Sequence, residues 1–282
     1  LIMLVLGLEL GQRLNWFESS MIRIFIVAGL ALLVLFFINE WSHPLPFFKL
    51  QLLKNRNLTH ALITLGGVLF VLLALIKIPS AYLAQIQGYR PLQTAPMMLL
   101  VALPQLIALP LVVALCNLRR VDCRWVLAVG LALLALACGL GSQVTSVWSR
   151  ENFYVLQAIQ IIAQPMAVIP LLMLATGSLH PAEGPFASAW FNTVKGFSAM
   201  AAGSVLQVVT LNREHFHSTM LVDRAGNSPL VSGDADLAHR IHQQAMVLSS
   251  SDLYLCMAGL AVLLIVLIPF GPTRIYPPRA PS

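Results

Sequence analysis

The sequence predicts an all-α integral membrane protein, and two properties of the chain support this. Of its 282 residues, 58% are hydrophobic and only 10% are charged, and the mean hydropathy is +0.82, whereas soluble domains average about 25% charged residues. The hydrophobic residues form long unbroken runs instead of the alternating pattern of barrel strands. Because lipid satisfies no backbone polar group, such runs must cross the bilayer as helices.

Seven runs approach the length of about 20 residues that one helical crossing requires. The predicted spans cover residues 22–39, 59–79, 95–115, 125–143, 153–175, 187–210 and 253–271. Ahead of them, the apolar run that begins at Leu1 is too short to cross, and we expect it to be the end of a helix whose beginning is missing.

Helix-breaking residues fall inside several of these spans and predict kinks. A proline removes one backbone hydrogen bond of the helix and clashes with the preceding turn. The residues concerned are Gly66, Gly67, Pro104, Pro110, Pro165 and Pro170.

Basic residues in the connections predict the orientation, because positively charged connections stay on the cytoplasmic side. They gather in alternate connections and in the C-terminal tail: Lys49, Lys54 and Arg56; Arg119, Arg120 and Arg124; Arg274 and Arg279. The C-terminus is therefore expected to be cytoplasmic, and residues 211–252 to form a long outer loop that is mobile at residues 226–229. Since the basic residues are scattered through short connections, nucleic acid is not an expected partner.

Four stretches resemble one family of transporters when they are taken in order. They are GQRLNWFESS (residues 11–20), EWSHPLPFFKLQLLKNRNL (40–58), QIQGYRPLQTAPMMLLVALP (85–104) and LHPAEGPFASAWFNTVKGFSAMAAGSVL (179–206). Together they resemble the 14-span drug:proton antiporters of the EmrB/QacA type, within the major facilitator superfamily. The resemblance covers nearly the whole chain.

This resemblance implies a major-facilitator-type helical bundle, of which the chain is the C-terminal half plus part of the inserted central helices. Residues 1–45 would contain the end of the first inserted helix and the whole second one, and residues 46–282 a six-helix bundle. The implied function is proton-coupled export of small amphipathic compounds across the inner membrane. The implied partners are the lipid bilayer, the missing N-terminal half, a periplasmic adaptor and an outer-membrane channel, with no cofactor and no metal.

One part of the sequence departs from the family pattern. The superfamily's cytoplasmic loop signature should fall within LCNLRRVDCRW, residues 115–125, where the expected glycines are missing. The residues that keep its charge character are Arg119, Arg120, Asp122 and Arg124.

The candidates for a substrate cavity are polar residues within the predicted spans. Gln157, Gln160 and Gln164 recur at helical spacing on one face, which favours either a cavity wall or hydrogen bonds between helices. Gln105 and Gln207 are expected to make interhelical contacts. No Asp or Glu falls in the interior of a complete span, so a carboxylate that couples transport to protons would have to come from the other half.

Further candidates lie near the ends of the predicted spans. Asn192 and Lys195 lie in the stretch that resembles the family, where Lys195 either reaches the cytoplasmic interface or contacts the other half at a gate. Tyr82 and Gln85 are cavity candidates. Lys77 either anchors its span at the outer interface or faces an outer vestibule.

Two other groups of residues admit more than one interpretation. Trp190 and Phe191 fit an interfacial aromatic belt better than a site for flat cations. Histidines 215, 217, 239 and 242 are spaced as metal ligands could be, but without fixed geometry they do not predict a metal site.

Three alternative functions remain open from the sequence. A nutrient or metabolite carrier would use the same scaffold, since a fold does not define a substrate. A non-transporting assembly fragment is a second alternative. An intramembrane enzyme is disfavoured because the chain contains no HExxH, GxSxG or GxxxxGK[ST] motif.

Overall fold

The computed structural model describes residues 2–11, 14, 16–42, 48–118, 120–177, 179–225 and 235–270. Within these ranges the chain is helical, with no β-strand. The α-helices are α1 (Ile2–Gly11), α2 (Ser20–Ser42), α3 (Arg56–Gln85), α4 (Pro91–Cys116), α5 (Cys123–Gly141), α6 (Arg150–Thr176), α7 (Gly184–Ala225) and α8 (Ala235–Leu267). Short 3-10 turns cover Trp16–Glu18, Leu50–Lys54, Pro181–Glu183 and Ile268–Phe270.

The prediction of seven membrane-length helices is confirmed. Seven helices in the described part of the chain, α2 to α8, are long and apolar enough to cross a membrane, and each predicted span falls on one of them. The predicted ends differ by a few residues. Helix α3 continues past Pro79 to Gln85, and α5 ends at Gly141, two residues before the predicted boundary.

The prediction of a long outer loop over residues 211–252 is wrong. Helix α7 continues to Ala225 and α8 begins at Ala235, so most of this segment is helical. Its polar residues suggested a loop, but several of them, such as Glu214 and Asp252, form contacts between the two helices, and Met246 and Leu253 of α8 are buried. Residues 226–229, predicted to be mobile, lie outside the described residues.

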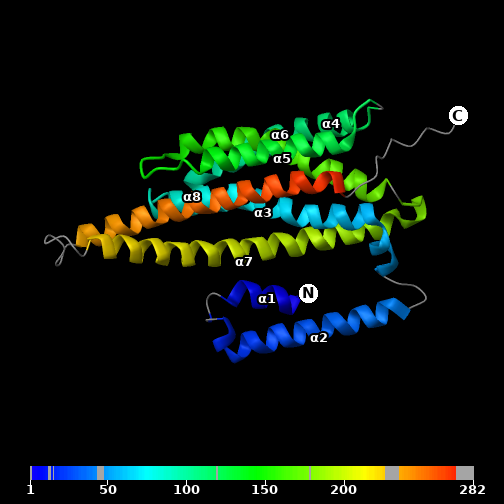
Figure 1. Cartoon of the computed structure of the whole chain (residues 1–282), viewed down its shortest axis with the longest axis horizontal. Helices are drawn as coiled ribbons and strands as arrows, with labels where there is room; N and C mark the ends of the chain where they lie inside the picture. The colour runs from blue at the N-terminus through cyan, green and yellow to red at the C-terminus, as the bar shows by residue number, and fades with distance from the viewer. Residues whose placement is uncertain are drawn as a thin grey trace.

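Successive helices of the bundle run antiparallel, and α3 lies at its centre. The connections from α3 to α4 and from α5 to α6 lie at one end, and those from α4 to α5 and from α6 to α7 at the other (Figure 1). Helix α3 contacts α6, α7 and α8, and α5 packs closely on α6. Helices α1 and α2 form a separate antiparallel pair beside α7.

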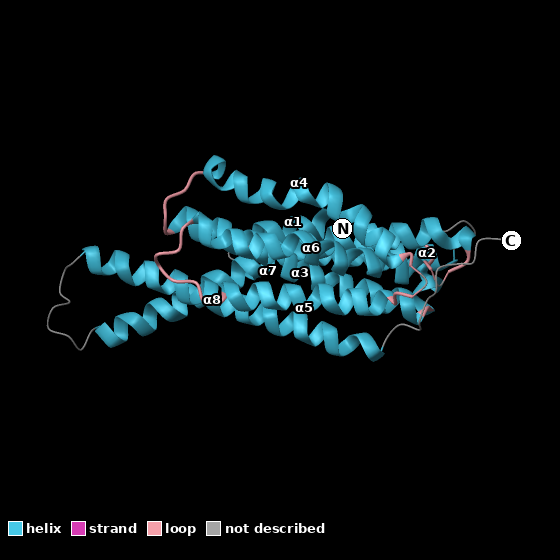
Figure 2. Cartoon of the chain, turned by 90° about the horizontal axis from the view of Figure 1, so that it is seen from above, coloured by secondary structure: helices cyan, strands magenta, loops and turns pink. Residues whose placement is uncertain are grey.

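Helices α7 and α8 are longer than one crossing requires. Helix α7 has 42 residues, which corresponds to roughly 60 Å at about 1.5 Å per residue, twice the approximately 30 Å of bilayer hydrocarbon. Figure 2 shows these two helices projecting beyond the ends of the others. Helices α7 and α8 therefore extend beyond the bundle at the end where α3 joins α4.

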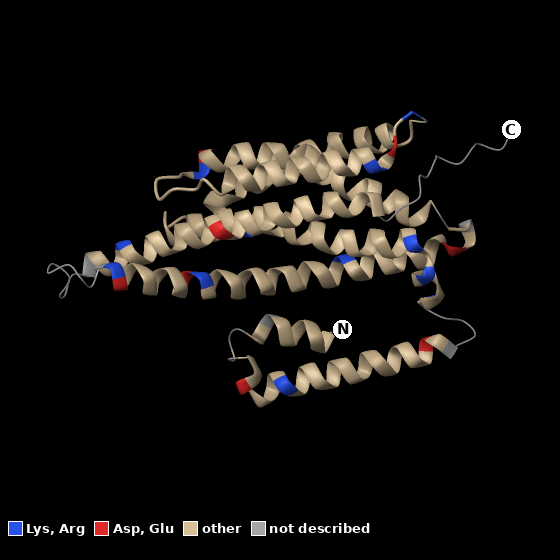
Figure 3. Ribbon diagram, viewed as in Figure 1, with Lys and Arg blue, Asp and Glu red and all other residues tan. Residues whose placement is uncertain are grey.

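The surface of the bundle is that of a protein in lipid. Large apolar side chains are exposed on the outer helices, and those of α4 include Leu92, Leu103, Leu106, Ile107 and Leu111. Charged residues gather toward the helix ends and leave the middle of the bundle largely without charge (Figure 3). Exposed apolar side chains cost no free energy where they face lipid acyl chains instead of water. This distribution therefore fits a multi-pass membrane protein.

Trp190 and Phe191 are buried, so the prediction that they form an interfacial belt is wrong. The Trp190 ring packs edge-on against Phe48, with ring centroids 5.2 Å apart, and its indole N–H donates to the Lys49 carbonyl at 3.4 Å. Lys49 also forms an ion pair with Glu183. These contacts tie the segment ahead of α3 to the start of α7.

The α5–α6 contact depends on Gly130. A Cβ atom at this position would lie 2.6 Å from the Met166 carbonyl carbon and 2.7 Å from the Ala167 backbone nitrogen. The carbonyl of Met166 lacks its usual helical donor because residue 170 is proline. The two backbones thus meet at a point where only glycine fits without moving a helix.

We predict that Gly130→Ala destabilises the protein by about 1–3 kcal/mol, the usual cost of overpacking a tight interior. The matched control is Gly139→Ala on the same helix, where an added Cβ meets no atom within 4 Å. Thermal unfolding in detergent should show a lower midpoint for Gly130→Ala alone. Equal midpoints for the two variants would contradict the packing argument.

Candidate functional site

The glutamines of α6 are engaged in contacts between helices. The side-chain amide of Gln157 is buried and donates from Nε2 to the Leu75 carbonyl of α3 at 2.9 Å. That carbonyl is available because Pro79, four residues later, has no N–H to donate. Gln157 thus replaces the hydrogen bond that the proline removes from the helix.

The other two glutamines face different surroundings. Gln164 Oε1 accepts a hydrogen bond from Gln105 Nε2 at 2.8 Å, so Gln105 makes the interhelical contact predicted for it. Gln160 is fully buried, and neither polar atom of its amide has a hydrogen-bond partner among the described residues. The face shared by these glutamines therefore points into the bundle.

A pocket of about 290 Å³ opens between α3, α7 and α8. It lies toward the end of the bundle where α3 joins α4. Its polar lining includes a cation, an anion, two amides and two hydroxyls, and apolar side chains complete the wall. These polar residues are Lys77, Gln85, Gln207, Thr210, Glu214 and Ser250.

Several residues suggested by the sequence thus meet at one place, and others lie apart. Gln85 and Lys77 line the pocket, and so does Gln207, for which an interhelical contact was expected. Tyr82 is fully buried beside it; its hydroxyl donates to the Thr145 carbonyl and its ring packs edge-on against Phe153.

Asn192 and Lys195 are exposed on α7 and lie more than two turns before Gly203, the first residue of this helix that lines the pocket. They are therefore separate from it.

The residues predicted to form the cytoplasmic loop motif lie between α4 and α5 and at the start of α5. Asp122 is the N-cap of α5, where its Oδ1 accepts from the Arg124 backbone N–H at 3.1 Å. Arg124 Nε is buried and has no hydrogen-bond partner in the part of the chain that the structure describes, and Arg120 is exposed. Arg119 lies outside the described residues.

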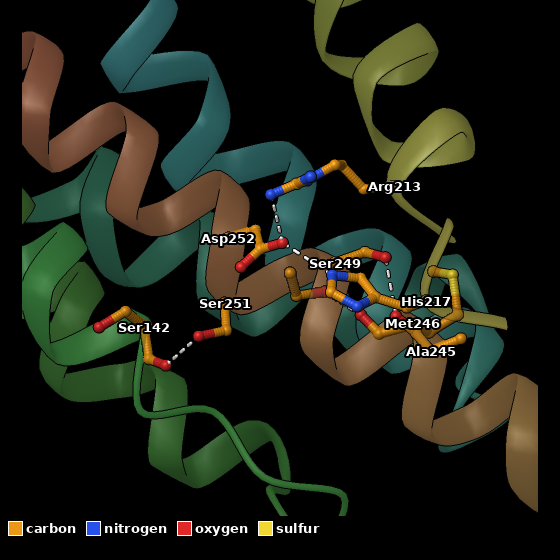
Figure 4. A network of polar contacts seen from close by, with 9 residues as sticks. Ser142, Arg213, His217, Ala245, Met246, Ser249, Ser251 and Asp252 are labelled. Carbon is orange, nitrogen blue, oxygen red and sulfur yellow. Dashed lines mark hydrogen bonds and ion pairs between the residues drawn. The ribbon is translucent and has the colours of Figure 1, made fainter. Parts of the chain in front are cut away.

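A second polar cluster joins α7 to α8 next to the pocket (Figure 4). Asp252 of α8 accepts from Arg213 at 2.9 Å and lies 2.7 Å from His217 Nε2, both on α7. Neighbouring Ser251 donates to the Ser142 carbonyl at 2.6 Å, just after α5 ends. The cluster therefore lies near the end of the bundle where α5 joins α6.

This cluster corrects the expectation that acids lie only at span ends and in loops. Asp252 lies well inside α8, and its side chain is 27% exposed. Glu214 lies inside α7, is 17% exposed, and pairs with His242 Nδ1 at 2.9 Å. Neither acid was expected inside a helix, because one predicted span ended at residue 210 and the last one began at residue 253. Continuing the helical periodicity through both boundaries could have found them.

The histidines of the hairpin pair with different groups. His217 contacts Asp252, His242 contacts Glu214, and His239 lies 3.0 Å from the Gln243 amide. Within the described ranges, no three His, Cys, Asp or Glu side chains converge on a point that could hold a metal ion.

We predict that Gln157→Leu destabilises the protein by roughly 1 kcal/mol, the usual size of a side-chain hydrogen bond between membrane helices. In a Pro79→Ala background the cost should shrink, because alanine at this position supplies the backbone N–H that the Leu75 carbonyl lacks. Gln164→Leu, which loses the bond to Gln105 instead, should cost the same in both backgrounds. A double-mutant cycle of unfolding free energies measures this, and a Gln157→Leu cost independent of residue 79 would contradict it.

Comparisons with known proteins place the chain near membrane transporters. No family model matches it. It is 23% identical to a probable multidrug resistance protein, EmrY of Escherichia coli strain K12, over 297 aligned positions that cover 96% of this chain and 57% of that protein. It is 21% identical to the multidrug export protein EmrB of Escherichia coli K12 and O157:H7, over 94% of this chain and 56% of those proteins. The chain thus spans little more than half the length of these relatives and is weakly similar to them along most of its own.

Proposed function

We propose that this chain is the C-terminal half of a 14-span major-facilitator antiporter that exports small amphipathic compounds across the inner membrane in exchange for protons. The observation that carries the proposal is the similarity of nearly the whole chain to proteins named for multidrug export and resistance. Seven membrane-length helices support it. Residues 1–45 would contain the inserted helices and residues 46–282 the six-helix bundle.

The pocket between α3, α7 and α8 is the proposed contribution of this half to substrate passage. Amide and hydroxyl groups among apolar walls suit compounds that have both polar and apolar parts. In transporters built from two bundles, the substrate path lies between the halves, so one bundle supplies one wall. The N-terminal half would supply the other wall, and a periplasmic adaptor and outer-membrane channel would receive the compound.

The groups proposed to carry protons are the two carboxylate–histidine pairs beside this pocket. Glu214 and Asp252 are each paired with a histidine and partly withdrawn from solvent. Partly buried ionisable groups in a transporter are candidates for proton coupling. Asn192, Lys195, Gln157, Gln160 and Gln164 remain proposed contacts to the substrate or to the other half.

We predict that the native polypeptide containing these residues lowers ethidium accumulation in cells that lack their own multidrug exporters, and that a protonophore abolishes the effect. Glu214→Gln should abolish ethidium export at unchanged protein level. The control Asp223→Asn removes an exposed carboxylate of the same helix and should have no effect. Unchanged accumulation with the native polypeptide would refute drug export, and full activity of Glu214→Gln would remove this residue from proton coupling.

The proposed orientation has its own test, based on single cysteines in connections at the two ends of the bundle. Val147, 83% exposed, lies between α5 and α6, and exposed Arg120 lies between α4 and α5. With Cys256 replaced by Ser, Val147→Cys should react with a membrane-impermeant maleimide in intact cells. Arg120→Cys should react only after permeabilisation. The reverse pattern would invert the orientation.

A further inference from the structure

Two carboxylate–histidine pairs join α7 to α8 in a crossed arrangement. In one pair the acid, Glu214, comes from α7 and the histidine, His242, from α8. In the other the histidine, His217, comes from α7 and the acid, Asp252, from α8. Each helix thus contributes one proton-binding base and one carboxylate to the contact with its neighbour.

The two pairs differ in what happens when the imidazole loses its proton. Asp252 has a positively charged partner at every pH, because Arg213 also contacts it at 2.9 Å. A guanidinium group is never neutral in a protein. Glu214 has no second cation in contact, since His242 is its ion-pair partner among the described residues. The charge next to Glu214 therefore depends on one titratable ring.

The pocket lining contains one alternative cation for Glu214. Lys77 of α3 and Glu214 of α7 both line the 290 Å³ pocket, and none of the ion pairs between described residues involves Lys77. The lysine side chain has a long flexible stem with a compact charge at its end. Movement of these two side chains into the pocket would bring their charges together across its opening.

We propose, building on the exporter function proposed above, that Glu214 is a two-position gate of this pocket. It pairs with His242 of α8 while that imidazole carries a proton, and with Lys77 of α3 once the proton leaves. The first position leaves the pocket open, and the second closes it with an ion pair that joins α3 to α7. The structure corresponds to the first position.

The direction of the pH effect follows from the charges. When the His242 imidazole carries a proton, its bond to Glu214 is charge-assisted, which makes it roughly twice as strong as a neutral bond. When the imidazole is neutral, only Lys77 offers Glu214 a positive charge from within the pocket. Of the other charged groups nearby, Arg213 and His217 are held by Asp252, and His239 is next to Gln243.

The test measures the separation of α3 and α7 as a function of pH. Spin labels at Ala84→Cys of α3 and Asn212→Cys of α7, both exposed positions, report this separation by EPR in the native polypeptide reconstituted in lipid, with Cys256 replaced by Ser. We expect a short-distance population that grows as the pH rises between about 5 and 8. Lys77→Met should keep the long distance at every pH, and His242→Gln should give the short distance at every pH.

The matched control is His239→Gln, which removes a histidine one turn from His242 and should leave the pH response unchanged. An absent pH response in the unsubstituted protein, or one that persists in His242→Gln or Lys77→Met, would overturn the gate. Loss of the response in His239→Gln would also overturn the assignment to His242. Because the measurement requires no transport, it stands or fails independently of the ethidium assay.

Discussion

The need to satisfy backbone polar groups in the absence of water governs this structure. In the described ranges the chain meets it mainly by forming helices, and at Pro79 a neighbouring helix supplies the bond that the proline removes. The contact between Gln157 and the Leu75 carbonyl is the clearest case, since the amide takes the place of the N–H that Pro79 lacks. The buried amide of Gln157 thus satisfies a backbone group of the neighbouring helix.

Most of the fold could be predicted from the sequence, because hydrophobic length determines where a helix crosses lipid. Runs of about 20 apolar residues have no other stable conformation there, so seven spans were found to within a few residues. The same criterion misplaced the ends of α7 and α8. Residues 211–225 and 235–252 are richer in polar side chains, so hydrophobic length alone did not assign them to helices, although they are helical and α7 packs on α8.

The candidate site was less predictable for a related reason. Helical spacing placed the α6 glutamines on one face, but it does not identify the neighbouring helix, so it could not decide between a cavity wall and a contact such as Gln105 with Gln164. Gln85 was recognised as a candidate, whereas Glu214 and Asp252 were excluded once their segments had been assigned to a loop. Pairing between α7 and α8 brings acids and histidines together that are distant in sequence, a relation that only the fold determines.

The length of α7 and α8 has a mechanical consequence. Ionic contacts to Asp252 and Glu214 join α7 to α8, and the ends of these two helices extend beyond the other helices (Figure 2). Two long helices that are joined by these contacts and extend beyond the bundle can act as a lever. A small tilt at the base becomes a larger sweep at the tip, so a local change in charge is amplified into a displacement outside the bundle.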